Sequence, residues 1–407
     1  MLLVFIGLQS GLLRLNRWVL GFFVAGGLGA LLALTVGHGH LFVTVYGARI
    51  FVLHVPLIFL IGRVFNRDDM VLMAKVMMGV AIPMSVLLAL QFYSPQSAWV
   101  NVGVGGEGSS GFSGAMGRFR PSGTFSFTNG STMFFSLLAP FLFFAWLDKV
   151  AIPMWLKAGA TLALFIALPV SISRSLVFQT VLTSAFSVLV MSRNPKVVGR
   201  FLGAGVAIGI LGLVVDNIPA YSGAKEVLAA RFESAGKVEG GLEGTLVDRF
   251  LGGLIGAIAG SFNQPFFGNG IGMGTNVGAQ FLSGERGFLI AEGEWGRAIG
   301  ELGTFLGLLV VLFRIDLTIH VGLKAWAALG KGNILPWLLL SVNALWLSQG
   351  GWAQPTSLGF CVVGGGLTLA ALKSSPRKPF RRNRGEGWAQ EISGAEQEGE
   401  GEVELAK

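Results

Sequence analysis

Long apolar runs recur along the chain as far as Leu372, and they constrain its fold more than any other feature of the sequence. Most of them approach the roughly 20 residues that a helix needs to cross a bilayer. The chain is 52% apolar and only 13% charged, which is typical of polytopic membrane proteins. We therefore predict an all-α integral membrane protein with about ten transmembrane helices, namely Trp18–Val36, Leu41–Gly62, Val71–Tyr93, Thr132–Leu147, Ala151–Val170, Leu176–Met191, Phe201–Val215, Arg297–Phe313, Ile334–Ser348 and Thr356–Leu372.

The short loops between these runs are either basic or uncharged. With ten spans, the basic loops all fall on one side, which the positive-inside rule assigns to the cytoplasm. The short loops of the other side, Gly37–His40 and Gln349–Pro355, contain no lysine or arginine. The pattern predicts that both termini are cytoplasmic. The basic residues concerned are Arg14, Arg17, Arg63, Arg67, Lys149, Lys157, Arg193, Lys196, Arg200, Lys324, Lys331 and the run Lys373–Arg384.

This orientation divides the chain into a membrane domain, residues 1–372, and a tail, residues 373–407. Two long segments of the membrane domain, about 94–131 and 216–295, are expected to be periplasmic loops. The tail is basic at first and acidic after Glu386, and it has few residues to bury. We expect it to be a disordered cytoplasmic segment.

Two shorter apolar stretches do not fit a simple span. Thr245–Gly260 is apolar except for Asp248 and Arg249, which predicts a helix on the outer membrane face, with a re-entrant segment as the alternative. Met1–Leu13 is too short to cross a bilayer as a helix. We expect it to form a surface helix or to be the remnant of a span.

Few residues suit redox or metal chemistry. Cys361 is the one cysteine, so no intrachain disulfide can form, and only His38 and His40 among the four histidines are close in sequence. We predict no metal and no cofactor. The net charge of +8 comes from the loops, and it reflects orientation in the membrane more than nucleic-acid binding.

One charged stretch stands at the mouth of an apolar run. Glu292, Glu294, Arg297 and Glu301 join the longest polar segment to the predicted eighth span. In a helix that starts near Glu294, the last three share one face, because they are spaced i, i+3 and i+7. Charges at the mouth of a membrane helix are candidates for function. The alternative is an interfacial cap, since acids are favoured at a helix N-terminus.

Arginines gather on the predicted outer side, against the orientation rule. Those concerned are Arg118 and Arg120 before a span, Arg174 at a helix junction, Arg249 in the predicted surface helix, and Arg297. Arg49 lies about 12 Å inside the second span, at 1.5 Å per residue. One guanidinium group can donate two parallel hydrogen bonds to the oxygens of a phosphate. We therefore expect an external pocket for an anion such as a lipid-linked pyrophosphate. The alternatives are interfacial anchoring for each outer arginine and a buried acid partner for Arg49.

A glycine-rich segment, Phe266–Thr275, lies between these charged regions. Its glycines alternate with other residues, so it is not a dinucleotide-binding fingerprint. It predicts either a tight turn whose backbone approaches a substrate or a flexible loop.

Taken in order, these motifs resemble the O-antigen ligase and O-antigen polymerase superfamily. The resemblance rests on Arg-Pro-Ser-Gly-Thr-Phe-Ser-Phe-Thr-Asn, Ser-Arg-Ser at an outer helix start, Arg249 followed by Pro265 and a Gly-x-Gly run, and Glu-x-Glu-Trp-x-Arg. It covers roughly Trp18–Leu372. Characterised ligases have a histidine near the start of the helix after the large periplasmic loop, where this chain has Glu292 and Glu294.

The resemblance implies a metal-independent glycosyltransferase of the bacterial inner membrane, involved in polysaccharide biosynthesis. Its substrate would be an undecaprenyl-pyrophosphate-linked glycan, and its partners the lipid bilayer and polysaccharide assembly or export proteins, with no nucleic acid. The family's pyrophosphate-binding arginines match Arg120, Arg174 and Arg249, with Arg49 as a deeper candidate. We expect Glu294, or Glu292 in its place, to be the catalytic base. The alternatives are a ligase with a lipid or protein acceptor, and a transporter or flippase.

Overall fold

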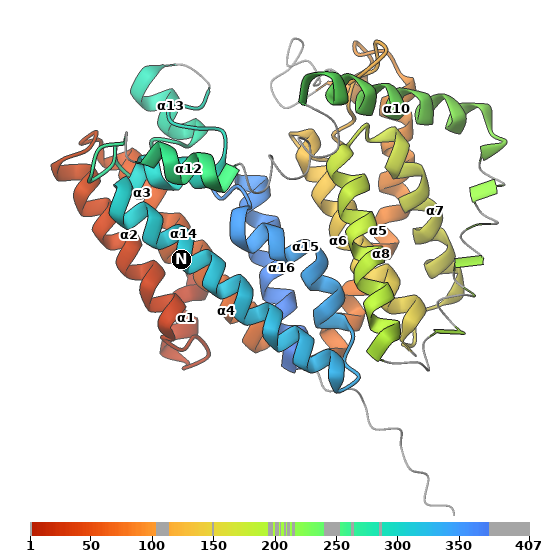
Figure 1. The fold of residues 1–407 in the computed structure, drawn as a ribbon, viewed down its shortest axis with the longest axis horizontal. Coiled ribbons are helices and arrows are strands. Elements are labelled where there is room, and N and C mark those ends of the chain that lie inside the picture. Colours follow the sequence, from red (N-terminus) through yellow and green to blue (C-terminus); the bar gives the residue numbers. More distant parts are fainter. Residues whose placement is uncertain are drawn as a thin grey trace, which may run out of the picture. The chain divides into compact units, whose positions relative to one another are not determined.

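The computed structural model describes residues 2–102, 114–148, 150–193, 216–239, 253–261, 264–284 and 287–373, and isolated positions between 198 and 213. Within these residues the chain is helical, and no β-strand occurs. They lie in one compact unit, Met1–Ser374 (Figure 1). The predicted tail beyond Lys373, and Arg249, lie outside the described residues.

Seven helices in the described part of the chain are long and apolar enough to cross a membrane. One more, α7 (Met154–Val170), is apolar but shorter, and α15 (Leu335–Gln349) is a further short helix. The prediction of an all-helical, multi-pass membrane protein is confirmed at this level, whereas the number of ten spans stays a prediction. The seven are α2 (Arg17–Thr35), the run of α3 (Leu41–Arg49), η1 (Ile50–His54) and α4 (Val55–Val64), α5 (Arg67–Tyr93), α6 (Thr128–Leu147), α8 (Arg174–Arg193), α14 (Glu294–Gly330) and α16 (Pro355–Lys373).

The loops predicted to be external are tied together at one end of the bundle. The Gln91 amide, at the end of α5, bonds both backbone groups of Gly123, donating at 3.1 Å and accepting at 2.8 Å. His38, between α2 and α3, lies 3.2 Å from the carbonyl oxygen of Ile271 through its Nε2. The first contact holds one predicted loop to the helix before it, and the second joins two predicted loops that are far apart in sequence.

The opposite ends of the helices have contacts of their own. Arg67 at the start of α5 pairs with Asp148 after α6 at 3.0 Å. Asn333, between α14 and α15, donates to the carbonyl of Ala371 near the end of α16 at 2.8 Å. Each of these two contacts joins a pair of segments that are predicted to lie on the basic side, whose assignment to the cytoplasm stays a prediction.

The predicted eighth span, Arg297–Phe313, is wrong in its course. Gly303 has φ +83 and ψ 174, so α14 consists of two helical pieces that meet there. Glu294 and Arg314 form an ion pair at 2.8 Å, although about 30 Å would separate residues 20 apart in a straight helix. The piece before Gly303 therefore folds back on the piece after it, and the long apolar helix is residues 304–330.

The predicted surface elements are partly helical. α1 (Leu2–Gln9) is a short helix with Leu2, Leu3 and Phe5 exposed, as expected of a surface helix. The described residues of the second long loop form three helices, α10 (Pro219–Glu239), α12 (Gly253–Ser261) and α13 (Asn276–Ser283). α12 includes the described part of the predicted surface helix, and its Ser261 carbonyl accepts a hydrogen bond from Thr304 at 2.7 Å.

Candidate functional site

The glycine-rich segment packs against the reversal of α14. A Cβ on Gly303 would overlap the carbonyl oxygen of Phe266, and its positive φ also favours glycine. The N–H of Asn269 donates to the carbonyl of Gly300 at 2.9 Å, and the next N–H donates to the next carbonyl at 3.0 Å. The segment is thus a turn bonded to the backbone of its own chain.

The same turn also contacts α3. Gly272 has φ +93, and a Cβ there would overlap the carbonyl oxygen of Val43. Such close backbone approaches exclude any larger residue. The alternating glycines therefore allow one turn to fit between α3 and the reversal of α14. They are needed for the close approach of this turn to the backbone of its own chain.

Glu294 lies at the centre of a buried charge network. Its carboxylate is 2% exposed, and Oε1 accepts from Arg297 Nη2 at 2.7 Å and Arg314 Nη1 at 2.8 Å. Oε2 accepts from Arg297 Nε at 3.0 Å and from the N–H of Trp352, which follows α15, also at 3.0 Å. A carboxylate offers about four lone-pair positions. With four donors bound, Glu294 joins three segments and presents no open oxygen to a hydroxyl group.

Arg297 and Glu301 complete the network. The prediction that Glu294, Arg297 and Glu301 share a face is confirmed, because Arg297 pairs with both acids. Glu301 binds Arg297 Nη1 through Oε2, and its Oε1 accepts the N–H of Gly274 at 2.8 Å. The Arg297 side chain is 2% exposed between two carboxylates, so in this arrangement it neutralises acids and has no open edge toward a phosphate.

Arg314 is a member of the network that the sequence analysis missed. It lies in the middle of the long helix, where Nε donates to the carbonyl of Leu347 at 2.9 Å and Nη2 to that of Gly350 at 2.8 Å. Its guanidinium stacks 3.7 Å from the ring centre of Trp352. The predicted span ended one residue before it, at Phe313. A charge flanked by apolar residues on both sides was the available signal.

Glu292 differs from Glu294 in being exposed. It precedes the first residue of α14 by two positions. Of the two predicted catalytic carboxylates, Glu292 and Glu294, a solute can approach that of Glu292. The catalytic roles of both residues stay predictions. Among the residues that the structure describes, no group of three His, Cys, Asp or Glu side chains could hold a metal ion.

Adjacent residues of α6 hold the segments that carry Arg120 and Arg174. Ser131 donates to the carbonyl of Pro121 at 3.2 Å. The next hydroxyl along α6 donates to Ser173 Oγ at 3.0 Å. The chain just after Arg120 and the chain just before Arg174 therefore lie side by side, and both arginines are half-buried.

The turn that leads into Arg174 has an unusual backbone. Ile172 is buried and has φ +49, a conformation that β-branched residues rarely adopt. Its Cδ1 lies against Gly114, whose N–H donates to the carbonyl of Arg118 at 2.9 Å. Strained backbone of this kind occurs at functional sites more often than elsewhere. Arg118 itself is exposed and donates to the carbonyl of Phe92 at 3.2 Å.

The start of α6 also connects these arginine segments to the charge network. Asn129 Nδ2 donates to Ser357 Oγ, in the first turn of α16, at 2.7 Å. The connection that precedes α16 carries Trp352, whose N–H bonds Glu294. The arginine segments and the carboxylates are therefore linked through consecutive contacts at the same end of the bundle.

Arg49 does not join this group through any contact in the described residues. Its guanidinium lies 3.6 Å from the ring centre of Tyr46, and its Nε donates to the carbonyl of the same residue at 3.1 Å. The buried acid partner that we weighed for Arg49 is not among these contacts. Arg49 instead adjoins the π-helical turn Ile50–His54, whose His54 Nδ1 lies 3.0 Å from the Arg49 carbonyl.

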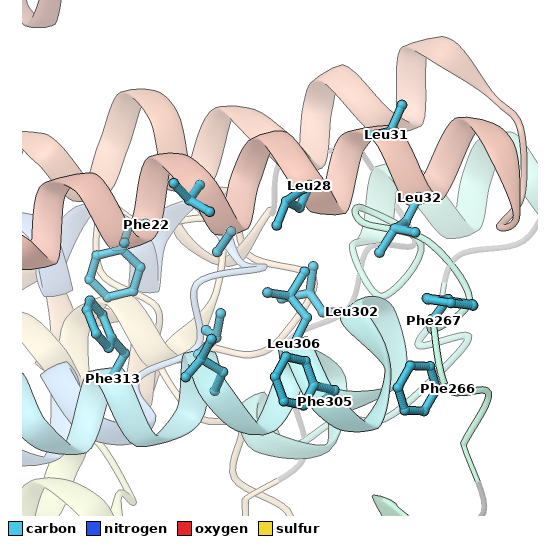
Figure 2. Close-up of a pocket in the computed structure, with 15 residues that line it drawn as sticks. Phe22, Leu28, Leu31, Leu32, Phe266, Phe267, Leu302, Phe305, Leu306 and Phe313 are labelled. Carbon is cyan, nitrogen blue, oxygen red and sulfur yellow. The ribbon is translucent and has the colours of Figure 1, made fainter.

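A separate apolar groove runs between α2 and α14 (Figure 2). It has a volume of about 390 Å³, and every residue that lines it is apolar. Leu28 and Leu32 of α2 form one side, and Phe305 and Leu306 of α14 form the other. Its lining includes none of the predicted site residues, so it is distinct from the charged region.

No protein-family model matches the chain, and no curated protein gives a significant sequence match. The class of the protein therefore follows from its architecture alone. The described residues are all-helical, and seven of their helices could cross a membrane.

Proposed function

We propose that this protein is a glycosyltransferase of the inner membrane. It transfers or polymerises glycans linked to polyprenyl pyrophosphate at the periplasmic face of that membrane. The observation that supports the proposal is the meeting of the Arg120 and Arg174 segments on adjacent residues of α6. A polyanion bound there would lie at the same end of the bundle as the exposed Glu292. Arginine pairs suit phosphate because they donate parallel hydrogen bonds.

In the proposed reaction, the bond between the anomeric carbon and the pyrophosphate oxygen breaks as an acceptor hydroxyl attacks that carbon. Arg120 and Arg174 bind the departing pyrophosphate and offset its growing charge. A carboxylate accepts the proton of the hydroxyl, and direct displacement inverts the anomeric centre. We assign the base to Glu292 instead of Glu294, because Glu292 is exposed and Glu294 already accepts four hydrogen bonds.

The assay is purified protein with a glycan on polyprenyl pyrophosphate, in which released carrier and lengthened glycan are measured. Glu292→Gln should lower turnover by about two to four powers of ten, the usual effect of losing a general base, while the yield of folded protein stays unchanged. Glu294→Gln should instead lower thermal stability. Full turnover in Glu292→Gln would contradict the assignment of the base. Transfer to a lipid or protein in place of a growing glycan would indicate a ligase.

Carrier binding is measured separately. Arg120→Ala and Arg174→Ala should each weaken binding of polyprenyl pyrophosphate about tenfold, since a charge-assisted hydrogen bond contributes about 1.5–3 kcal/mol. Arg63→Ala is the matched control, because Arg63 is exposed at the opposite end of the bundle. If all three variants bind the carrier as tightly as the unchanged protein does, Arg120 and Arg174 are interfacial anchors. Binding without cleavage of any bond would favour a transporter or flippase.

A further inference from the structure

The groove between α2 and α14 has the dimensions of an extended hydrocarbon chain. Its α2 side runs from Gly21 to Leu32, which is about 17 Å at 1.5 Å per residue. Leu31, Phe305 and Leu309 along its rim are 57%, 68% and 47% exposed. The described part of the chain leaves this slot unfilled, and unfilled apolar surface loses packing contacts. A linear apolar ligand would restore them.

One end of the groove adjoins a cluster of charges. Gly21 and Phe313, which line that end, are each about one turn from an ion pair between Arg17 and Asp316 at 2.9 Å. Trp18 Nε1 donates to the same carboxylate, also at 2.9 Å. An indole and an arginine at one level are typical of the boundary between lipid chains and head groups.

The charges at this end are mainly positive. Lys324 is exposed and lies two turns beyond Asp316 on α14, and Arg14 is exposed just before α2. With Arg17, the ends of α2 and α14 near this part of the groove therefore carry three cations and one carboxylate, Asp316. The Arg17 side chain is 59% exposed and bonds Asp316 through Nη2, so other guanidinium N–H groups point to the surroundings. At the other end the groove is lined by Phe266, Phe267 and Leu32.

We propose that this groove binds one anionic glycerophospholipid. An acyl chain lies between α2 and α14, and the phosphate lies at Arg17 and Lys324. The charge surplus selects an anionic head group over a zwitterionic one, as basic pockets beside transmembrane helices do. The site is independent of the proposed glycan transfer, because the groove shares no residue with the Arg120, Arg174 and Glu292 region.

The test uses the full-length protein in detergent, with native mass spectrometry and titration of phosphatidylglycerol or phosphatidylcholine of equal chain length. We expect one phosphatidylglycerol to remain bound, and phosphatidylcholine to bind at least tenfold more weakly. Lys324→Gln should weaken binding of phosphatidylglycerol about tenfold, the usual effect of losing a charge-assisted hydrogen bond. Lys331→Gln is the matched control, since Lys331 is an exposed lysine seven residues farther along, and it should leave binding unchanged.

A second pair of variants tests the groove itself. Leu309→Trp places a ring across the groove from a rim position that is 47% exposed, and it should abolish retention of the lipid. Leu72→Trp, at a 59% exposed position on α5 away from the groove, should not. Equal binding of the two phospholipids, or full retention in Leu309→Trp, would overturn the proposal. Displacement of phosphatidylglycerol by polyprenyl phosphate at equal concentration would overturn it too, because the occupant would then be the carrier.

Discussion

Arg314 connects the charge network to the long piece of α14 that follows Gly303. It neutralises Glu294 in a site where both side chains are no more than 2% exposed. Removing one member of a buried pair leaves the other charge uncompensated, at a cost of about 3–5 kcal/mol. Arg314→Met should therefore lower the free energy of unfolding by about that amount, measured by thermal unfolding in detergent. Arg67→Gln, which breaks a partly exposed pair, should cost about 1 kcal/mol or less.

A second comparison separates charge from packing. Arg314→Met combined with Glu294→Gln removes both partners, so the double variant should be more stable than the sum of the single effects implies. Strict additivity would show that the two side chains do not interact. The sequence predicted the shared face of Glu294, Arg297 and Glu301, because their spacing is local. It could not predict the pairing of Glu294 with Arg314, which requires the chain to reverse, nor the four donors on one carboxylate.

The reversal of α14 depends on one glycine. Gly303 lies in a region of positive φ where side chains are strained, and a Cβ would also overlap the Phe266 carbonyl oxygen. Gly303→Ala should destabilise the protein by at least about 2 kcal/mol. Gly322→Ala in the same helix is the control, since its Cβ would meet only Leu340 at 3.6 Å. This change should stabilise the helix by about 0.5–1 kcal/mol. A stabilising effect of Gly303→Ala, like that expected of Gly322→Ala, would indicate a straight helix through Gly303 and contradict the reversal.

The elements were predictable where a single apolar run forms a single helix. α2, α5 and α16 begin and end within a few residues of the predicted spans. α14 was not predictable in this way, because apolar residues continue on both sides of Gly303 and nothing distinguishes it among 61 glycines. The reversal becomes visible only with its tertiary partner, the turn of Phe266–Thr275. The same turn explains why the alternating glycines could not be assigned from composition.

At the scale of the molecule, composition was sufficient for the class and insufficient for the site. Apolar runs predicted a helical, multi-pass chain, and contacts such as Arg67–Asp148 agree with the predicted grouping of basic loops. The depth of the charge network within the bundle depends on the length of α15. α15 has only 15 residues, about 22 Å of helix, so it is shorter than a bilayer core. The connection that carries Gly350 and Trp352 can therefore reach Arg314 within the bundle.

Labelling with a membrane-impermeant maleimide tests the topology of the whole chain. The native Cys361 is fully buried, so background labelling should be low. Trp99 is 85% exposed after α5, at the end predicted to be external, and Lys331 is exposed after α14, at the other end. In spheroplasts, Trp99→Cys should react directly and Lys331→Cys only after permeabilisation, because the positive-inside rule assigns the basic loops to the cytoplasm. An odd number of crossings must separate the two positions. Reaction of both from the same side would mean an even number of spans between them and contradict the ten-span prediction. The reverse pattern would invert the orientation and place Arg120, Arg174 and Glu292 in the cytoplasm.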